Sequence, residues 1–331
     1  MKILLWQTAF LGDLILTTSL VRCVKQLYSD AYLIVVSKPF GKEVFKYNPH
    51  VDELILFDKK KDSFLNLVFK LRQKQIDLAI SPHRSHRATL AIFLSGIKTR
   101  IGFDKAGFSF LYTKTCAHRF SGEHEIIRNL KLLTTLKSTD VSQLDLKPCL
   151  YLQPQEQEFL TKWQLNQSKY VVIAPGSKWP TKRWTVQGFK DVVRFLQQRD
   201  FQVVLMGGKE DVSICEEIGL EGKVLNLAGK TSLRESFALI SKARLLVSND
   251  SAPVHMAVAL NTPVVAIFGP TVKEFGFYPF QKGEVVEIDM DCRPCGLHGH
   301  KKCPLEHHRC MRQISSQKVI QVMGKFLTTQ D

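Results

Sequence analysis

The stretch at residues 247–271 places polar side chains where a buried strand should end and a helix should begin. A short apolar run predicts the strand, and Asn249, Asp250 and Ser251 follow it as good helix N-cap residues. Residues 264–268 predict the next buried strand. A helix N-terminus at the carboxyl end of a strand suits a phosphate, so an acid at that place is unexpected. We expect Asp250 to accept hydrogen bonds from sugar hydroxyls, or from a cap amide if it is an ordinary N-cap.

Two other predicted turns carry side chains that could do chemistry. Asp13 follows the apolar strand at residues 2–6 and lies near a helix start. It is either a general base that faces a cleft or an acid that stabilises the helix dipole. The loop at residues 175–184 combines a glycine and two hydroxyls with three cations, and its amides, Ser177 and a lysine would hold a diphosphate. The loop is not a Walker A motif, which disfavours a kinase or ATPase.

A basic cluster, His83, Arg84, Ser85 and Arg87, follows another predicted strand. Cations at a strand's carboxyl end could clamp a carboxylate or phosphate, although chance clustering in so basic a chain is the alternative. His124 lies near the start of an amphipathic helix, where it either faces the cleft or serves the structure. We therefore expect these residues to form a binding site for an anionic ligand in the first half of the chain.

The elements that must position these residues alternate between strand and helix along both halves of the chain. Such alternation predicts doubly wound parallel sheets, and 331 residues exceed the usual size of a single core. We predict an α/β fold with two Rossmann-like domains, at residues 1–155 and 166–312, that face a central cleft. The irregular stretch at residues 137–165 indicates the linker. A final helix within 313–331 is expected to pack back on the N-terminal domain.

The charge balance narrows the class of partner. Forty-six basic against 31 acidic residues give a net charge of +15, which favours nucleic acid, an anionic membrane, or phosphorylated and carboxylated substrates. No apolar run reaches the roughly 18 residues of a membrane span, and Gln7 and Asp13 interrupt the stretch that looks most like a signal peptide. We expect a cytoplasmic protein that contacts a membrane only peripherally.

A cysteine-rich segment lies near the C-terminus. Its four cysteines, Cys292, Cys295, Cys303 and Cys310, are interleaved with histidines. The spacing suits a structural zinc site, while reducible disulfides and free thiols are the alternatives. The nearby pair Asp289 and Asp291 could hold a metal ion on a diphosphate, or simply end a strand.

Taken together and in order, these motifs resemble glycosyltransferase family 9, the bacterial lipopolysaccharide heptosyltransferases, most closely the heptosyltransferase II type. The resemblance covers nearly the whole chain. It rests on Gly12-Asp13, on Pro82-His83-Arg84-Ser85, on Pro175-Gly176-Ser177 with Lys182-Arg183-Trp184, on the stretch from Asn249 to Pro270, and on the terminal cysteine pattern. One departure is Ala252-Pro253, where the family has glycine, because proline removes an N–H that a phosphate could use.

The resemblance implies a GT-B fold, in which the N-terminal domain binds the acceptor, here through His83, Arg84, Ser85, Arg87 and His124, and the C-terminal domain binds the nucleotide sugar. It also implies an inverting transfer from ADP-L-glycero-D-manno-heptose to the inner core on Kdo-lipid A, with no metal needed for catalysis. Asp13 is implied to be the base. The implied donor contacts are to the diphosphate from Ser177 and Lys182, to the nucleoside from Glu210 and Thr231, and to the heptose and phosphate region from Asp250, Ser251 and His255. The charge surplus agrees with an anionic acceptor at the inner leaflet of a membrane.

Two other readings stay open at this point. One is a different enzyme of the GT-B fold that uses nucleotide sugars, such as another glycosyltransferase or an epimerase. The other is a basic nucleic-acid-binding protein, which the sequence disfavours because no known motif of aromatic residues interleaved with Lys and Arg is present.

Overall fold

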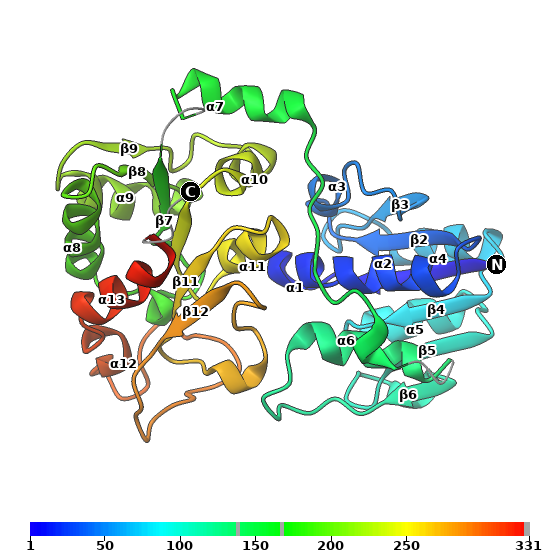
Figure 1. Ribbon diagram of the computed structural model, residues 1–331. Coiled ribbons are helices and arrows are strands. Elements are labelled where there is room, and N and C mark those ends of the chain that lie inside the picture. The colour runs from blue at the N-terminus through cyan, green and yellow to red at the C-terminus, as the bar shows by residue number, and fades with distance from the viewer. Residues whose placement is uncertain (137–139, 166–168, 328–331) are drawn as a thin grey trace. The chain divides into compact units, whose positions relative to one another are not determined.

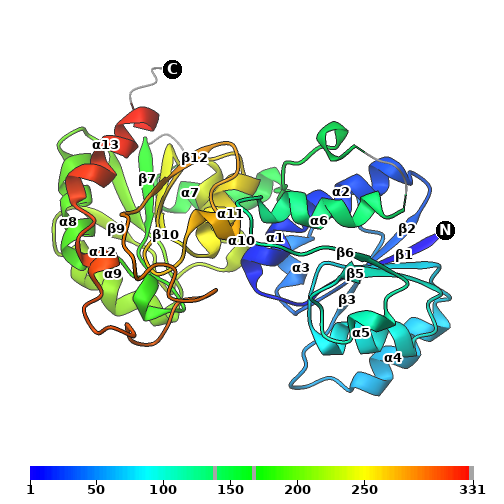
Figure 2. The same ribbon diagram turned by 90° about the horizontal axis from the view of Figure 1, so that it is seen from below.

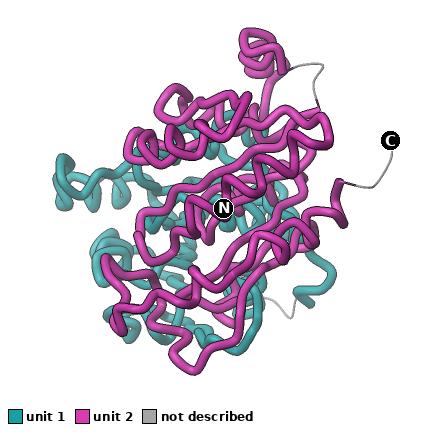
Figure 3. Tube along the Cα trace, turned by 90° about the vertical axis from the view of Figure 1, so that its left-hand side faces the viewer, with its two compact units in different colours: residues 1–151 teal, residues 152–331 magenta. Residues whose placement is uncertain are grey.

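The computed structural model describes residues 1–136, 140–165 and 169–327. The chain divides into two compact units, Met1–Tyr151 and Leu152–Asp331 (Figure 3). Residues 137–139, at the start of the predicted linker, and 166–168, where the second domain was expected to begin, lie outside the described residues. Among the described residues, no helix has the length and apolar character that a membrane crossing needs.

The N-terminal unit contains one parallel sheet with helices on both faces (Figures 1 and 2). Its strands are β1 (Lys2–Gln7), β2 (Tyr32–Ser37), β3 (Glu53–Leu56), β4 (Leu78–Ser81), β5 (Thr99–Phe103) and β6 (Lys114–Cys116). Its helices are α1 (Leu11–Leu16), α2 (Thr18–Leu27), α3 (Gly41–Val44), α4 (Phe64–Gln73), α5 (His86–Leu94), η1 (Ser109–Leu111), α6 (Glu125–Thr134) and η2 (Val141–Gln143). In Figure 2, α2 and α6 cover one face of the sheet, and α4 and α5 cover the other.

The C-terminal unit repeats this plan. Its strands are β7 (Tyr170–Ala174), β8 (Gln202–Leu205), β9 (Val224–Asn226), β10 (Leu245–Asn249), β11 (Val264–Ile267) and β12 (Gly283–Val286). Its helices are η3 (Pro154–Gln157), α7 (Glu158–Lys162), η4 (Pro180–Lys182), α8 (Val186–Gln197), η5 (Lys209–Asp211), α9 (Val212–Gly219), α10 (Leu233–Ser241), α11 (Ala252–Ala259), η6 (Lys273–Phe275), α12 (Arg309–Arg312) and α13 (Ser316–Leu327).

Both sheets have the strand order of a Rossmann fold. The first sheet runs β3-β2-β1-β4-β5-β6, and the second runs β9-β8-β7-β10-β11-β12, which is the same order within its own unit. All strand pairs are parallel, and central strands such as β1, β7 and β10 are apolar because helices cover both faces. The order reverses between β1 and β4 and again between β7 and β10. Ligands bind at such switch points, outside the carboxyl ends of the strands.

The last helix differs from the prediction. We expected it to return to the N-terminal unit, but Val319 and Met323 of α13 are buried in the core of the C-terminal unit, and α13 packs on α8, β11 and β12. The connection explains this placement. Cys310 and Met311 of α12 are anchored in the same core, and only residues 313–315 join the two helices.

Candidate active site

Asp13 lies at the switch point of the first sheet. It is the third residue of α1, directly beyond β1, and the segment that follows β4, the neighbouring strand, carries His83 and Arg84. One carboxylate oxygen, Oδ2, accepts a hydrogen bond of 3.2 Å from the backbone N–H of Phe10. The side chain therefore caps α1, as one of the two readings expected, and this bond also fixes its position at the strand's end.

The surroundings of Asp13 favour a stronger base than an exposed aspartate. Burial raises the pKa of Asp13, while the bond from Phe10 and the positive charges of Arg84 and Lys38 oppose the rise. A carboxylate with a raised pKa accepts a proton more readily, as a general base must. Lys38 was not among the residues singled out from the sequence.

A buried ion pair, which was not predicted from the sequence, also belongs to this region. Glu125 Oε2 accepts hydrogen bonds from Arg128, at 2.9 Å from Nε and 2.7 Å from Nη2, and the Arg128 side chain is only 2 % exposed. Burial and the charge of Asp13 together raise the pKa of Glu125 to about 7, although Arg128 acts to lower it. His118 Nε2 lies 3.9 Å from the same oxygen. On a helix, three residues apart, such a pair reads as an ordinary surface contact.

The predicted acceptor residues divide into two groups. His83, Ser85 and His124 are engaged in structural hydrogen bonds. His83 Nδ1 lies 2.9 Å from Thr8 Oγ1, Ser85 caps α5, and His124 caps α6 with Nδ1 and is fully buried. Arg84 and Arg87 remain exposed.

Burial also changes the charge expected for the basic cluster. It lowers the pKa of His83 to about 4, with Lys38 and Arg84 adding to the effect. His83 is therefore neutral near pH 7 and is not one of the cations that the sequence suggested. The cationic part of the cluster is Arg84 and Arg87, and Arg84 also lies over the ring of Phe120, 5.8 Å from its centroid.

At the switch point of the second sheet, Lys182 and Asp250 form an ion pair. Their Nζ and Oδ2 atoms are 2.5 Å apart, and the side chains are only 12 % and 9 % exposed. Thr271 Oγ1 donates a second hydrogen bond of 2.6 Å to the same oxygen. The helix α11 begins after Ser251, whose side chain makes no cap bond. Asp250 thus fixes the lysine that the loop prediction assigned to a diphosphate, and it is not an ordinary N-cap.

The loop at residues 175–184 is fastened to the end of β10 by a single side chain. Asn249 Oδ1 accepts a bond of 3.0 Å from the backbone N–H of Trp184, and its Nδ2 donates at 2.7 Å to the carbonyl of Pro175. Glycine is required at position 176, because a Cβ there would lie 2.2 Å from Cγ of Asp211. The loop is therefore held at both ends against the switch point.

Within this loop Ser177 is nearly buried, and its Oγ accepts from the backbone N–H of Trp179 at 3.3 Å. Ser251 Oγ lies within 3.5 Å of the carbonyl of Gly176 and 3.4 Å of Ser248 Oγ. These contacts bring the loop at residues 175–184 and the turn after β10 together at the carboxyl ends of β7 and β10.

His255 is the predicted donor residue with an unused polar atom. It lies one turn into α11, it is 6 % exposed, and its Nδ1 has no hydrogen-bond partner among the described residues. Burial lowers the pKa of His255 to about 4, partly offset by Asp250. The ring is therefore neutral, so it can give or accept one hydrogen bond but supplies no charge.

The remaining two predicted donor residues follow other strands. Glu210 lies in η5, after β8, and is exposed. Thr231 lies after β9, and its hydroxyl is 2.9 Å from Ser236 Oγ. Within the part of the chain that the structure describes, no hydrogen bond or ion pair joins either residue to the Lys182–Asp250 pair.

A family model for glycosyltransferase family 9 (heptosyltransferase) matches residues 64–307, most of the chain. The chain belongs to this family. Lipooligosaccharide heptosyltransferase 2 of Campylobacter jejuni serotype O:2 is 27% identical over 330 residues, covering 97% of both chains. Lipopolysaccharide heptosyltransferase 3 of Escherichia coli K12 is 32% identical over 283 residues, covering 78% of this chain and 80% of that protein. The resemblance found in the sequence is thus confirmed, and the protein is a glycosyltransferase.

Solved structures confirm the predicted GT-B fold class. The structure of E. coli ADP-heptose lipopolysaccharide heptosyltransferase II has a TM-score of 0.82 at 25% identity and covers 99% of this chain and 98% of that one. A family 9 glycosyltransferase from Veillonella parvula, 24% identical, has a TM-score of 0.86 and covers 98% and 97%.

The cysteine segment of this heptosyltransferase was predicted to hold a structural zinc ion, with disulfides and free thiols as the alternatives. Cys292, Cys295, Cys303 and Cys310 are free thiols, and among the described residues no three His, Cys, Asp or Glu side chains are placed to hold a metal ion. Cys295 Sγ instead donates to the carbonyl of Cys292 at 3.2 Å. Burial and the neighbouring thiols of Cys295, Cys303 and Cys292 together raise the pKa of Cys310 to about 11.

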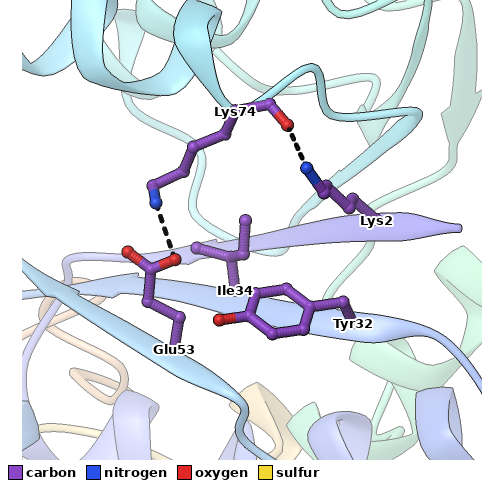
Figure 4. Close-up of a pocket in the computed structure, with 5 residues that line it drawn as sticks. All are labelled: Lys2, Tyr32, Ile34, Glu53 and Lys74. Atoms are coloured by element: carbon purple, nitrogen blue, oxygen red, sulfur yellow. Dashed lines mark hydrogen bonds and ion pairs between the residues drawn. The ribbon is translucent and has the colours of Figure 1, made fainter.

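A small pocket in the N-terminal unit lies at the other edge of the sheet (Figure 4). Lys2, Tyr32, Ile34, Glu53 and Lys74 line it, at the amino ends of β1, β2 and β3. Its lysines are already bonded, Lys74 Nζ to Glu53 at 2.7 Å and Lys2 Nζ to the carbonyl of Lys74 at 2.9 Å. Because the switch point is at the carboxyl ends, this pocket is separate from the candidate active site.

Proposed function

We propose that this glycosyltransferase transfers heptose from ADP-L-glycero-D-manno-heptose to the inner core of lipopolysaccharide, on an acceptor of the heptosyl-Kdo2-lipid A type, with inversion at the anomeric carbon. The observation that carries the proposal is the placement of two complementary groups. A carboxylate of raised pKa lies at one switch point, and a cation held by a carboxylate lies at the other. The first can accept a proton and the second can meet a diphosphate.

Asp13 is the proposed base. It removes the proton from an acceptor hydroxyl as that oxygen attacks the anomeric carbon of the heptose. The bond from this carbon to the diphosphate oxygen breaks on the opposite side, and ADP leaves with the electron pair. One direct displacement inverts the configuration, and Asp13 ends the step protonated.

Lys182 is the proposed partner of the leaving diphosphate. In the free protein its charge is neutralised by Asp250, so a bound diphosphate can draw Lys182 away and leave Asp250 to accept hydrogen bonds from heptose hydroxyls. Ser177, Ser251 and the neutral ring of His255 supply further hydrogen bonds. Glu210 and Thr231 are proposed to contact the nucleoside.

The acceptor is proposed to meet the exposed Arg84 and Arg87, since guanidinium groups suit the carboxylates of Kdo and the phosphates of lipid A. His83, Ser85 and His124 shape that site through the hydrogen bonds described above. We further propose that the protein works in the cytoplasm, at the anionic inner leaflet. The proposal gives no step to a metal ion, and a structural zinc ion on Cys292, Cys295, Cys303 and Cys310 stays a prediction.

The experiment combines purified protein with ADP-heptose and Kdo2-lipid A carrying no heptose or one. ADP release and the mass of the product are followed together. The proposal expects both signals to appear with the monoheptosylated acceptor. ADP release without a heavier acceptor, or no turnover with either acceptor, would contradict it.

A further inference from the structure

Large apolar side chains are exposed on one face of the N-terminal unit. Leu65 and Phe69 of α4 are 61% and 62% exposed, Phe93 and Leu94 of α5 are 41% and 40% exposed, and Phe110 of η1 is 79% exposed. Helices α4 and α5 lie side by side on the same face of the sheet (Figure 2), and η1 contacts α5. We call these five residues the α4–α5 face.

These side chains lie outside the core of the unit, where Phe93 lies beneath the guanidinium of Arg100 and Phe110 packs edge-on against Phe108. The inner stripe of α4, with Leu67, Val68 and Leu71, already packs in the core. Leu65 and Phe69 are four residues apart, so they form a second apolar stripe on the outer side of the helix. An exposed apolar patch of this kind marks an interaction site more often than chance.

The same part of the chain is strongly basic. Residues 59–114 contain 12 Lys and Arg against 3 Asp and Glu, a net charge of +9 out of +15 for the whole chain. Eight of these cations are exposed and form no ion pair with any residue that the structure describes: Lys59, Lys60, Lys61, Lys70, Arg72, Arg87, Lys98 and Lys105.

We propose that the α4–α5 face docks on an anionic lipid bilayer, with its apolar side chains among the acyl chains and its cations at the lipid headgroups. This combination of an apolar stripe and flanking Lys and Arg is the one that interfacial helices use. The inference rests on the proposed function, because an acceptor built on lipid A is itself anchored in a membrane.

The position of the face supports this occupant. Its η1 end adjoins the proposed acceptor arginine: the backbone N–H of Gly107 donates to the carbonyl of Arg84 at 3.1 Å, and His86 packs edge-on against Phe108 with ring centroids 4.9 Å apart. A docked face would hold Arg84 close to the bilayer surface, where the head of a lipid-anchored acceptor lies. Nucleic acid is the less fitting partner, because leucine side chains in a helical stripe do not stack on bases.

The test is co-sedimentation of the full chain with phosphatidylcholine vesicles, with and without phosphatidylglycerol. Wild type is expected to bind the anionic vesicles preferentially and to be released by salt. The double variant F69S/F110S is expected to bind about tenfold more weakly or worse, since two apolar anchors are lost. L220S is the matched control, because Leu220 is 83% exposed in the C-terminal unit and outside the face. Thermal unfolding of all variants shows that they are folded.

Turnover separates this inference from the proposed function. With an acceptor dispersed in detergent, F69S/F110S is expected to keep the wild-type rate, and with the acceptor in vesicles it is expected to lose rate. Equal vesicle binding by wild type and F69S/F110S overturns the docking face, whatever the activity. Tighter binding to RNA than to vesicles, weakened by the same variant, also overturns it. Absence of turnover by wild type with normal vesicle binding counts against the proposed function alone.

Discussion

Replacement of Asp13 by asparagine separates the proposed base from its structural role. The amide oxygen of Asn can accept the same bond from the Phe10 N–H that Asp13 Oδ2 accepts at 3.2 Å, so the start of α1 should be kept. What D13N removes is the ability to take up a proton. Alanine at this position would remove both the acceptor of the Phe10 hydrogen bond and the group that takes up a proton.

The structure sets the size of the expected loss. A positioned general base contributes roughly 10²–10⁴-fold to a rate. Burial raises the pKa of Asp13 and so strengthens the base, while Arg84 and Lys38 act against that rise. We therefore expect kcat to fall by about 10²-fold or more, which corresponds to about 2.7 kcal/mol of transition-state stabilisation. The KM for the donor should change little, because the predicted donor residues are elsewhere.

The assay is the initial rate of ADP release for wild type, D13N and D13A, across pH. The base works only when deprotonated, so the wild-type rate is expected to be lost as pH falls through the raised pKa of Asp13, and D13N should lack this acid limb. Glu125, with a pKa of about 7, can leave its own limb in both proteins, so the limb that only wild type shows is the one assigned to Asp13. D13A should in addition lose roughly 0.5–2 kcal/mol of stability. Near-normal turnover by D13N, or an unchanged acid limb, would refute the assignment.

Three further perturbations test other parts of the site. K182M should raise the Kd for ADP, measured by calorimetry, by about tenfold or more, since a charge-assisted contact to the diphosphate is lost. An unchanged Kd would show that Lys182 pairs with Asp250 and does not bind the diphosphate. H255N should flatten the pH dependence of stability. Wild-type His255 has a pKa near 4 in the folded protein in place of 6.5, so it gains a proton on unfolding and wild type loses stability as pH falls from about 6.5 to 4. If the free energy of unfolding in urea has the same slope against pH in both proteins, this reasoning is wrong. R128M should lower the free energy of unfolding by roughly 3–5 kcal/mol, because it leaves Glu125 buried without its partner. The double variant R128M/E125Q should recover part of that stability. A double variant no more stable than R128M would count against the ion-pair argument.

The positions of the candidate site residues in the fold could be predicted because they depend on local sequence. Buried parallel strands are apolar runs, and each run ends at a turn whose polar residues stand out. This is how Asp13 after β1, Lys182 after β7 and Asp250 after β10 were found. The parallel order then brings the turns of neighbouring strands together, since the carboxyl ends of such strands share one edge.

The partners of these residues could not be predicted in the same way. Asp250 bonds to Lys182 and Thr271, which are 68 and 21 residues away in the chain. Nothing local signals such pairs. The neutral state of His83 depends on how deeply the ring is buried, and sequence reasoning counted it as a potential cation. Likewise β6 is only three residues long and mostly exposed, so it carries no apolar pattern.

Helix α4 shows why exposure had to come from the structure. Its sequence, FLNLVFKLRQ, has apolar residues on more than one side, and a helix of that kind is normally buried all round. The structure buries Leu67, Val68 and Leu71 and leaves Leu65 and Phe69 in contact with solvent. The excess charge of residues 59–114 can be counted from the sequence, but it is the outer apolar stripe that distinguishes a surface built for lipid from a merely basic one. Charge alone would attract any polyanion, whereas charge around exposed phenylalanine and leucine favours a partner with an apolar interior.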